Sequence, residues 1–139
     1  MLKYEIDLER SKVVYENCKH LVQMKMCYNN IFNVVTDYIS YFRTGKWKVA
    51  YGFVEVMAGL YCRHCFILDE NNKVIDPTFF TNSEQYDREY YVMTAFDDVD
   101  EYLTALENEN YMPVLENYFR EQDRQAIKWA LDKGYIFVD

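Results

Sequence analysis

The hydrophobic pattern of the chain switches from a helical period to a strand period near residue 45, and this switch limits the fold more than any other feature. Before it, apolar side chains recur every three to four residues in one stripe, formed by Cys27, Ile31, Val34, Val35, Tyr38 and Phe42. After it, the segment WKVAYGFVEV at 47–56 alternates with a period of two and is rich in valine and aromatic residues, as strands are. The chain therefore starts with helices and continues with a sheet.

The remaining segments follow the same two patterns. Helices are predicted at 6–24, 27–43, 98–107 and 121–133, with a further short helix that begins near Pro113. Strands are predicted at 47–56, 61–68, 73–77 and 88–96. This order predicts an α+β fold in which N-terminal helices pack on an antiparallel sheet and C-terminal helices follow. No linker rich in proline or glycine interrupts the 139 residues, so we expect one domain over 1–139, with a helical C-terminal part at 97–134.

Charge and composition exclude several classes of protein. The net charge of -8 argues against non-specific binding to DNA or to anionic lipid, because both need lysine and arginine to displace counterions. Mimicry of nucleic acid and a basic protein partner are compatible with it. The N-terminal MLKYEIDLER lacks a hydrophobic signal core, and no apolar run is long enough to cross a bilayer. Four cysteines are too few for a disulfide scaffold. We expect a cytoplasmic protein with reduced thiols, and its oligomeric state stays open.

The segment LYCRHCFIL at 60–68 invites a metal or redox interpretation. Cys62 and Cys65 flank His64, and Cys18 or Cys27 could complete a zinc site. On a strand, however, residues 62 and 64 point to one face and residue 65 to the other, whereas a chelating pair normally lies on a turn. A thioredoxin-like pair would need its first cysteine at the start of a helix. The sequence therefore predicts neither a metal nor a cofactor.

Cys27 stands at the head of the strongest predicted helix. A thiol in that position meets the positive end of the helix dipole and unpaired backbone N–H groups, and both favour the thiolate. The same N–H groups could stabilise an oxyanion. The alternative is that Cys27 is a small buried hydrophobic residue, the commoner role of a free cysteine.

His64 and Asp76 are predicted to meet across a hairpin. A turn centred near residue 70 makes them direct cross-strand partners on one face of the sheet. A carboxylate in this position can hold one ring nitrogen and direct the other toward a nucleophile. A structural His–Asp pair without any chemistry would leave the same pattern in the sequence.

Four segments in this order resemble a family of small bacterial and phage proteins with the papain-like cysteine peptidase fold, which is related to transglutaminase-like enzymes. They are MCYNN at 26–30, VAYGFVEV at 49–56, RHCFIL at 63–68 and KVIDPT at 73–78. The family pattern has Cys-Tyr-x-Asn at a helix start, then an aromatic-Gly-aromatic strand, a His-Ala-Trp-like strand and Asp-Pro-Thr. The chain departs from it at Cys65 and Phe66, which replace Ala-Trp, and at Tyr51, where members often carry an acidic residue.

The resemblance implies a role for each matched residue. Cys27 becomes the nucleophile, His64 the base and Asp76 the acid that orients it, while Asn30 matches the asparagine of the motif. Gln23 lies only four residues before Cys27, closer than the oxyanion glutamine of papain-like enzymes. The backbone N–H of Cys27 is therefore the first choice for an oxyanion donor, with Gln23 or Asn30 as alternatives.

These features predict a cysteine-dependent amide hydrolase or acyl transferase, of the peptidase, deamidase or transglutaminase type. It would act on a protein or peptide through a thioester intermediate. The alternative is an inactive papain-like binding or inhibitor protein from a phage or another mobile element. Such a protein would use its acidic surface and its 14 tyrosines to bind a partner.

Overall fold

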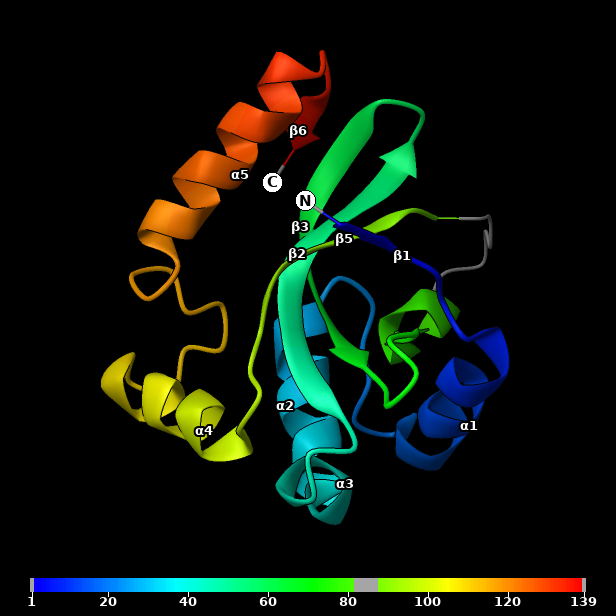
Figure 1. Cartoon of the computed structure of the whole chain (residues 1–139). Coiled ribbons are helices and arrows are strands. Elements are labelled where there is room, and N and C mark those ends of the chain that lie inside the picture. The colour runs from blue at the N-terminus through cyan, green and yellow to red at the C-terminus, as the bar shows by residue number, and fades with distance from the viewer. Residues whose placement is uncertain (1, 82–87, 139) are drawn as a thin grey trace.

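One curled sheet organises the chain, and helices surround it (Figure 1). Within the residues described by this computed structural model, 2–81 and 88–138, there are six strands and five α-helices. The strands are β1 (Leu2–Tyr4), β2 (Lys48–Met57), β3 (Leu60–Leu68), β4 (Val74–Ile75), β5 (Tyr90–Ala95) and β6 (Ile136–Val138). The helices are α1 (Leu8–Cys18), α2 (Cys27–Asp37), α3 (Ile39–Arg43), α4 (Val99–Asn108) and α5 (Arg120–Asp132), with a 3-10 helix η1 (Pro77–Thr81). The predicted α+β class with an antiparallel sheet is confirmed.

The sheet has the strand order β1-β5-β2-β3-β4, and β6 adds to β3 in parallel. The long β2–β3 hairpin forms its centre, with β5 antiparallel on the other side of β2. Two short strands share the outer edge of β3: β4 pairs with residues 67–68 and β6 with residues 60–62. Between them, residues 63–66 have no strand partner on that edge within the described part of the chain. His64 lies in this unpaired part of the sheet edge.

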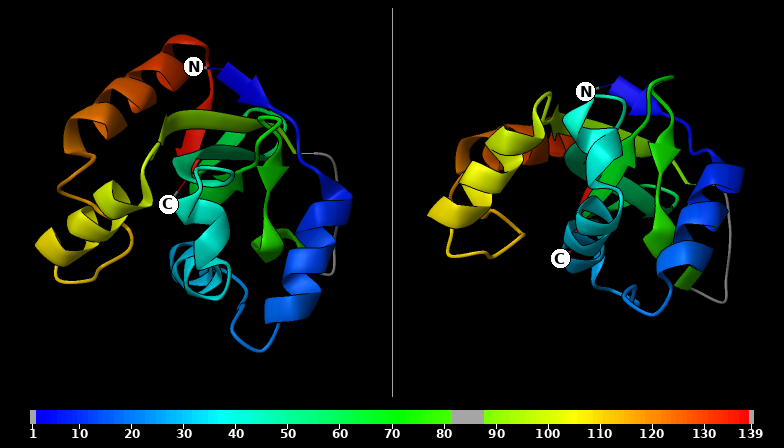
Figure 2. Two further views of the ribbon diagram at one scale, coloured as in Figure 1. Left: turned by 60° about the horizontal axis from the view of Figure 1, so that its bottom comes forward. Right: turned by 90° about the horizontal axis from the view of Figure 1, so that it is seen from below.

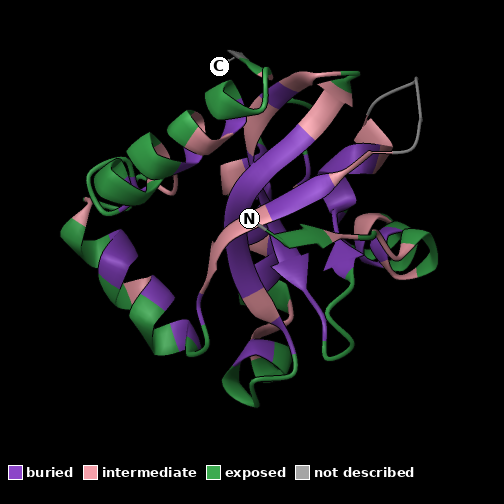
Figure 3. Cartoon of the chain, turned by 45° about the horizontal axis from the view of Figure 1, so that its top comes forward, coloured by how far each residue is buried: buried purple, intermediate pink, exposed green. Residues whose placement is uncertain are grey.

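The helices gather on one side of the sheet. In Figure 2, α2 lies between α1 and α4, and all three lie along the same side of the strands. The stripe predicted at 27–43 faces inward, since Ile31 and Val34 are fully buried in a core shared with the sheet residues Val49 and Ile67. Figure 3 shows the central strands buried and the outer faces of α4 and α5 exposed. None of the described helices has the length and apolarity needed to cross a membrane.

Several predicted elements are shorter than expected. The N-terminal helix covers only 8–18 of the predicted 6–24, and turns occupy 19–26, with Lys25 in a left-handed conformation at φ 63°. The helix predicted at 27–43 breaks at Tyr38, where φ -114° and ψ 29° leave the helical region, so α3 starts a new turn. The strand at 73–77 retains two residues because Pro77 begins η1.

The prediction of a short helix near Pro113 is wrong. This segment consists of turns, and Asn110, Tyr111 and Leu115 all have positive φ angles. Leu115 is fully buried in the core that α2 shares with the sheet. Burial of this side chain therefore sets the path of the segment, against its local preference for a helical turn.

The register of the β3–β4 hairpin also differs from the prediction. Asp69 closes the turn: its backbone N–H bonds to the Lys73 carbonyl, and its carboxylate accepts the N–H groups of Asn71 and Lys73. The turn is therefore centred on residue 71, and Ile67 faces Ile75. Continued by one residue, this register places Phe66 opposite Asp76. His64 and Asp76 are thus diagonal neighbours, whereas a turn centred near residue 70 would have paired them directly.

Candidate active site

The helix that carries Cys27 begins at this residue, and a buried amide fixes its start. Asn30 is 1% exposed and accepts a hydrogen bond from the Gln23 backbone N–H at 2.9 Å. Its amide nitrogen donates to the Gln23 carbonyl at 2.7 Å and to Thr78 Oγ1 at 2.9 Å. Asn30 therefore ties the preceding turn and η1 to the first turn of α2.

These contacts bear on the choice of oxyanion donor. Both amide protons of Asn30 are already donated, and the Gln23 side chain is exposed. No side chain caps the start of α2 in the described part of the chain. The backbone N–H groups at Cys27 are therefore the donors that this arrangement favours.

His64 meets Asp76 through one ring nitrogen and Cys27 through the other side of its ring. Nε2 lies 2.8 Å from Asp76 Oδ2, and the two side chains are 7% and 0% exposed. Cys27 is also among the groups that raise the pKa of His64, so its side chain lies near the ring. Because Asp76 occupies Nε2, Nδ1 is the nitrogen that remains for the thiol. The three predicted residues thus lie together in the order Cys27, His64, Asp76.

The charges of this group favour an ion pair. Burial of the imidazole lowers the pKa of His64, but the charge of Asp76, the hydrogen bond to it and the nearby Cys27 raise it well above 6.5. Burial raises the pKa of Asp76, but His64 and the Tyr90 hydroxyl outweigh this and leave the pKa below 3.8. The pairing with Asp76 therefore favours a protonated His64 imidazole.

We expect this ion pair to make stability depend on pH in two directions. The raised pKa of His64 contributes stability that is complete below 6.5 and is lost as pH rises through the folded value. The lowered pKa of Asp76 contributes stability that is present above 3.8 and is lost as pH falls through the folded value. The contribution of the pair to the free energy of unfolding should therefore be largest between these two values. Urea denaturation at a series of pH values measures this contribution. The prediction would be contradicted if the double variant His64→Gln/Asp76→Asn showed the same dependence of the free energy of unfolding on pH as the natural sequence.

Asp76 is held from two further elements. Its backbone N–H donates to Ser11 Oγ of α1 at 2.9 Å, and the Tyr90 hydroxyl of β5 donates to Oδ2 at 2.6 Å. Ser11 and Tyr90 are both fully buried. The sequence analysis missed both residues, because a serine in a helix and a tyrosine in a strand are too common to give a signal.

Replacement of Tyr90 by phenylalanine should destabilise the protein without unfolding it. The ring keeps its edge contact with Phe66, at 5.2 Å between centroids, but Asp76 loses one hydrogen bond. Hydrogen bonds to charged groups contribute about 1.5–3 kcal/mol, and we expect a loss of that size in urea denaturation. The matched control is Tyr38→Phe, which removes an exposed hydroxyl contact with Asn17 and should change stability by about 0.5 kcal/mol or less. Equal effects of the two variants would contradict a role for Tyr90 in holding Asp76.

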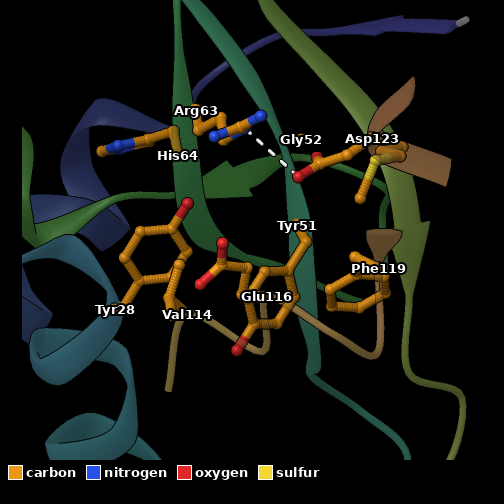
Figure 4. Close-up of a pocket in the computed structure, with 10 residues that line it drawn as sticks. Tyr28, Tyr51, Gly52, Arg63, His64, Val114, Glu116, Phe119 and Asp123 are labelled. Atoms are coloured by element: carbon orange, nitrogen blue, oxygen red, sulfur yellow. Dashed lines mark ion pairs between the residues drawn. The ribbon is translucent and has the colours of Figure 1, made fainter. Parts of the chain in front are cut away.

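A pocket of about 220 Å³ opens beside His64 (Figure 4). Its aromatic wall consists of Tyr28, Tyr51 and Phe119, and its polar side chains include Arg63, Glu116 and Asp123. The Tyr51 hydroxyl donates to the Pro113 carbonyl at 2.6 Å and so anchors the C-terminal segment over β2. The part of the chain at 97–134, to which the sequence analysis assigned no role, thus supplies one wall of the pocket.

Cys18 and Cys65 are buried, as Cys27 is, and Cys62 is partly buried. Cys65 is fully buried, and burial raises the pKa of its thiol well above the ordinary value. Burial also raises the pKa of Cys62, and burial with a hydrogen bond to Asp37 raises the pKa of Cys18 to about 11. Among the described residues, no group of three or more histidine, cysteine, aspartate or glutamate side chains is arranged to hold a metal ion.

Comparison with known proteins adds no relative to these observations. No protein-family model matches the chain, and neither a similar curated protein nor a similar solved structure was found. The case for a function at this site therefore depends on its geometry.

Proposed function

We propose that the protein is a cysteine-dependent amide hydrolase or acyl transferase with a papain-like arrangement of Cys27, His64 and Asp76. One observation carries the proposal: a buried imidazole that is hydrogen-bonded to Asp76 through Nε2 and lies near the thiol at the head of α2. The order of elements supports it, since a cysteine at a helix start precedes a histidine strand and an aspartate at the end of the next strand.

The first half of the reaction forms a thioester. The Cys27 thiolate attacks the amide carbonyl carbon, a C–S bond forms, and the carbonyl electrons move onto oxygen. Backbone N–H groups at the start of α2 stabilise this oxyanion. When the intermediate collapses, the C–N bond breaks and the His64 imidazolium gives its proton to the leaving amine.

The second half releases the acyl group. Neutral His64 takes a proton from water or from an acceptor amine, which then attacks the thioester carbon. The C–S bond breaks, and the electron pair returns to the Cys27 thiolate. Asp76 keeps its hydrogen bond to Nε2 throughout, so the imidazole stays oriented and its positive charge stays balanced.

Acylation by an activated ester tests the proposal. Incubation with p-nitrophenyl acetate should place one acetyl group on Cys27, detected by peptide mass spectrometry and removed by hydroxylamine as a thioester is. Cys27→Ala should abolish the modification, and His64→Ala should slow both its formation and its hydrolysis. Cys62→Ala serves as the matched control and should behave like the natural sequence. Acetylation spread equally over the cysteines would overturn the proposal.

A surface beside α4 favours the second candidate, a binding or inhibitor protein. Asp98, Asp100 and Glu101 line a shallow hollow of about 330 Å³ together with the exposed ring of Tyr118. Carboxylates beside an exposed tyrosine suit a basic protein partner. In that case Cys27→Ala would keep the full biological activity of the protein, whereas the enzyme proposal requires that the activity be lost.

A further inference from the structure

The pocket beside His64 has a continuous aromatic wall. The rings of Tyr28 and Tyr51 are stacked at 5.8 Å between centroids, and Tyr51 contacts Phe119 at 4.7 Å. The wall begins at Tyr28, the residue that follows Cys27 in α2. His64 also lines this pocket, so a group bound against these rings would lie beside the candidate base.

The charged side chains around this wall carry more negative than positive charge. Arg63 Nε lies 3.2 Å from Asp123 Oδ2, so this cation is neutralised within the pocket (Figure 4). His64 is paired with Asp76, since Nε2 lies 2.8 Å from Asp76 Oδ2. Figure 4 shows the Glu116 side chain reaching from the C-terminal segment toward Tyr28 and Tyr51. No described residue forms an ion pair with Glu116, so the pocket has one carboxylate in excess.

We infer that this pocket binds the positively charged side chain of a peptide, a lysine or arginine residue next to the amide that Cys27 attacks. This inference rests on the proposed function and narrows its substrate class. The partly exposed ring of Tyr28 can attract a cation through its quadrupole, and Glu116 supplies the opposite charge. The volume of about 220 Å³ lies below the range of roughly 300–1,000 Å³ that is common for small-molecule sites, and so suits a single side chain.

A binding measurement that does not use the thiol tests this inference. The probe is N-acetyl-lysine N-methylamide, and its neutral match is the norleucine analogue, which has the same aliphatic chain without the amine. Both are titrated into Cys27→Ala protein labelled at the methionine methyl groups, because the Met93 side chain lines the pocket. Met93 also borders a second hollow, at Trp129. Glu116 lines only the pocket beside His64, so the variant Glu116→Gln shows whether a shift of the Met93 resonance comes from that pocket. Glu107→Gln, the same change at an exposed position of α4, is the matched control.

We expect the Met93 methyl resonance to shift and saturate with the lysine compound. The norleucine compound should bind at least about fivefold more weakly, and Glu116→Gln should weaken lysine binding by a similar factor, the size of an exposed ion pair. Glu107→Gln should have no effect. Equal binding of the two compounds, or an unchanged affinity in Glu116→Gln, overturns the inference.

The two proposals fail in different ways. Lysine binding without acylation of Cys27 would retain the cation pocket and reject the enzyme. Acylation of Cys27 without any preference for lysine over norleucine would retain the enzyme and reject the cation pocket.

Discussion

Replacement of Asp76 by asparagine should slow the reaction of Cys27 with iodoacetamide at about pH 6 by tenfold or more, while the protein stays folded. Asparagine keeps the shape of the side chain but removes the charge that opposes protonated His64 at 2.8 Å. Charge-assisted hydrogen bonds are roughly twice as strong as neutral ones, so the imidazolium loses its main support. The thiolate then loses its cationic partner and reverts toward the less reactive thiol. Peptide mass spectrometry of the alkylated protein measures the rate.

The matched control is Asp69→Asn. Asp69 is also buried, at 4% exposure, but its carboxylate closes the hairpin turn through Asn71 and Lys73. This variant should lose stability and leave the rate at Cys27 unchanged in the folded protein. A Cys27 rate that Asp76→Asn does not alter, or that both variants reduce alike, would contradict the assigned role of Asp76.

Replacement of Gly52 by alanine should have the largest effect on stability. Gly52 pairs with His64 across β2 and β3, and the register between β2 and β5 shifts beside it. A Cβ atom at this position would lie 1.9 Å from the Tyr91 carbonyl oxygen. Relief of this clash requires β2 and β5 to separate, so we expect a loss of about 3 kcal/mol or more in the free energy of unfolding, the upper end for overpacking.

Gly59→Ala separates this clash from a general effect of losing a glycine. Gly59 has φ 78° in the β2–β3 turn, and a Cβ there meets no atom within 4 Å. The left-handed conformation alone costs alanine roughly 1–2 kcal/mol. In urea denaturation, Gly52→Ala should therefore have a much lower free energy of unfolding than Gly59→Ala. The reverse order would show that the close approach to Tyr91 is not what requires glycine.

Local sequence pattern was enough to predict the main elements and the meeting of His64 with Asp76. The change of period near residue 45 separates α2 and α3 from β2. The bounds of β2 differ from the predicted 47–56 by one residue at each end, and β3 begins one residue before the predicted 61–68. The register was wrong because the polar contacts of Asp69 set the length of the turn, and apolar alternation carries no information about them. His64 and Asp76 still share a face, since the error shifted the pairing by two residues.

The rest of the site depends on contacts between distant parts of the chain. Ser11 and Tyr90 reach Asp76 from 65 and 14 residues away, and Tyr51 holds the segment at Pro113 from 62 residues away. No local period marks such contacts. The pocket wall at Phe119 exists because the core fixes an irregular segment, which helix propensity did not foresee.

Site-resolved alkylation against pH tests the thiolate–imidazolium pair most directly. The folded protein is treated with iodoacetamide between about pH 5 and 9, a range that spans the ordinary titration of histidine and cysteine, and each thiol is read separately. Cys18, Cys62 and Cys65 are internal references, since burial raises the pKa of each. We predict that Cys27 reacts fastest at about pH 6 and loses this advantage in His64→Ala. An inert Cys27, or a Cys27 whose reaction follows the pH dependence of an ordinary thiol in both proteins, would contradict the proposed active site.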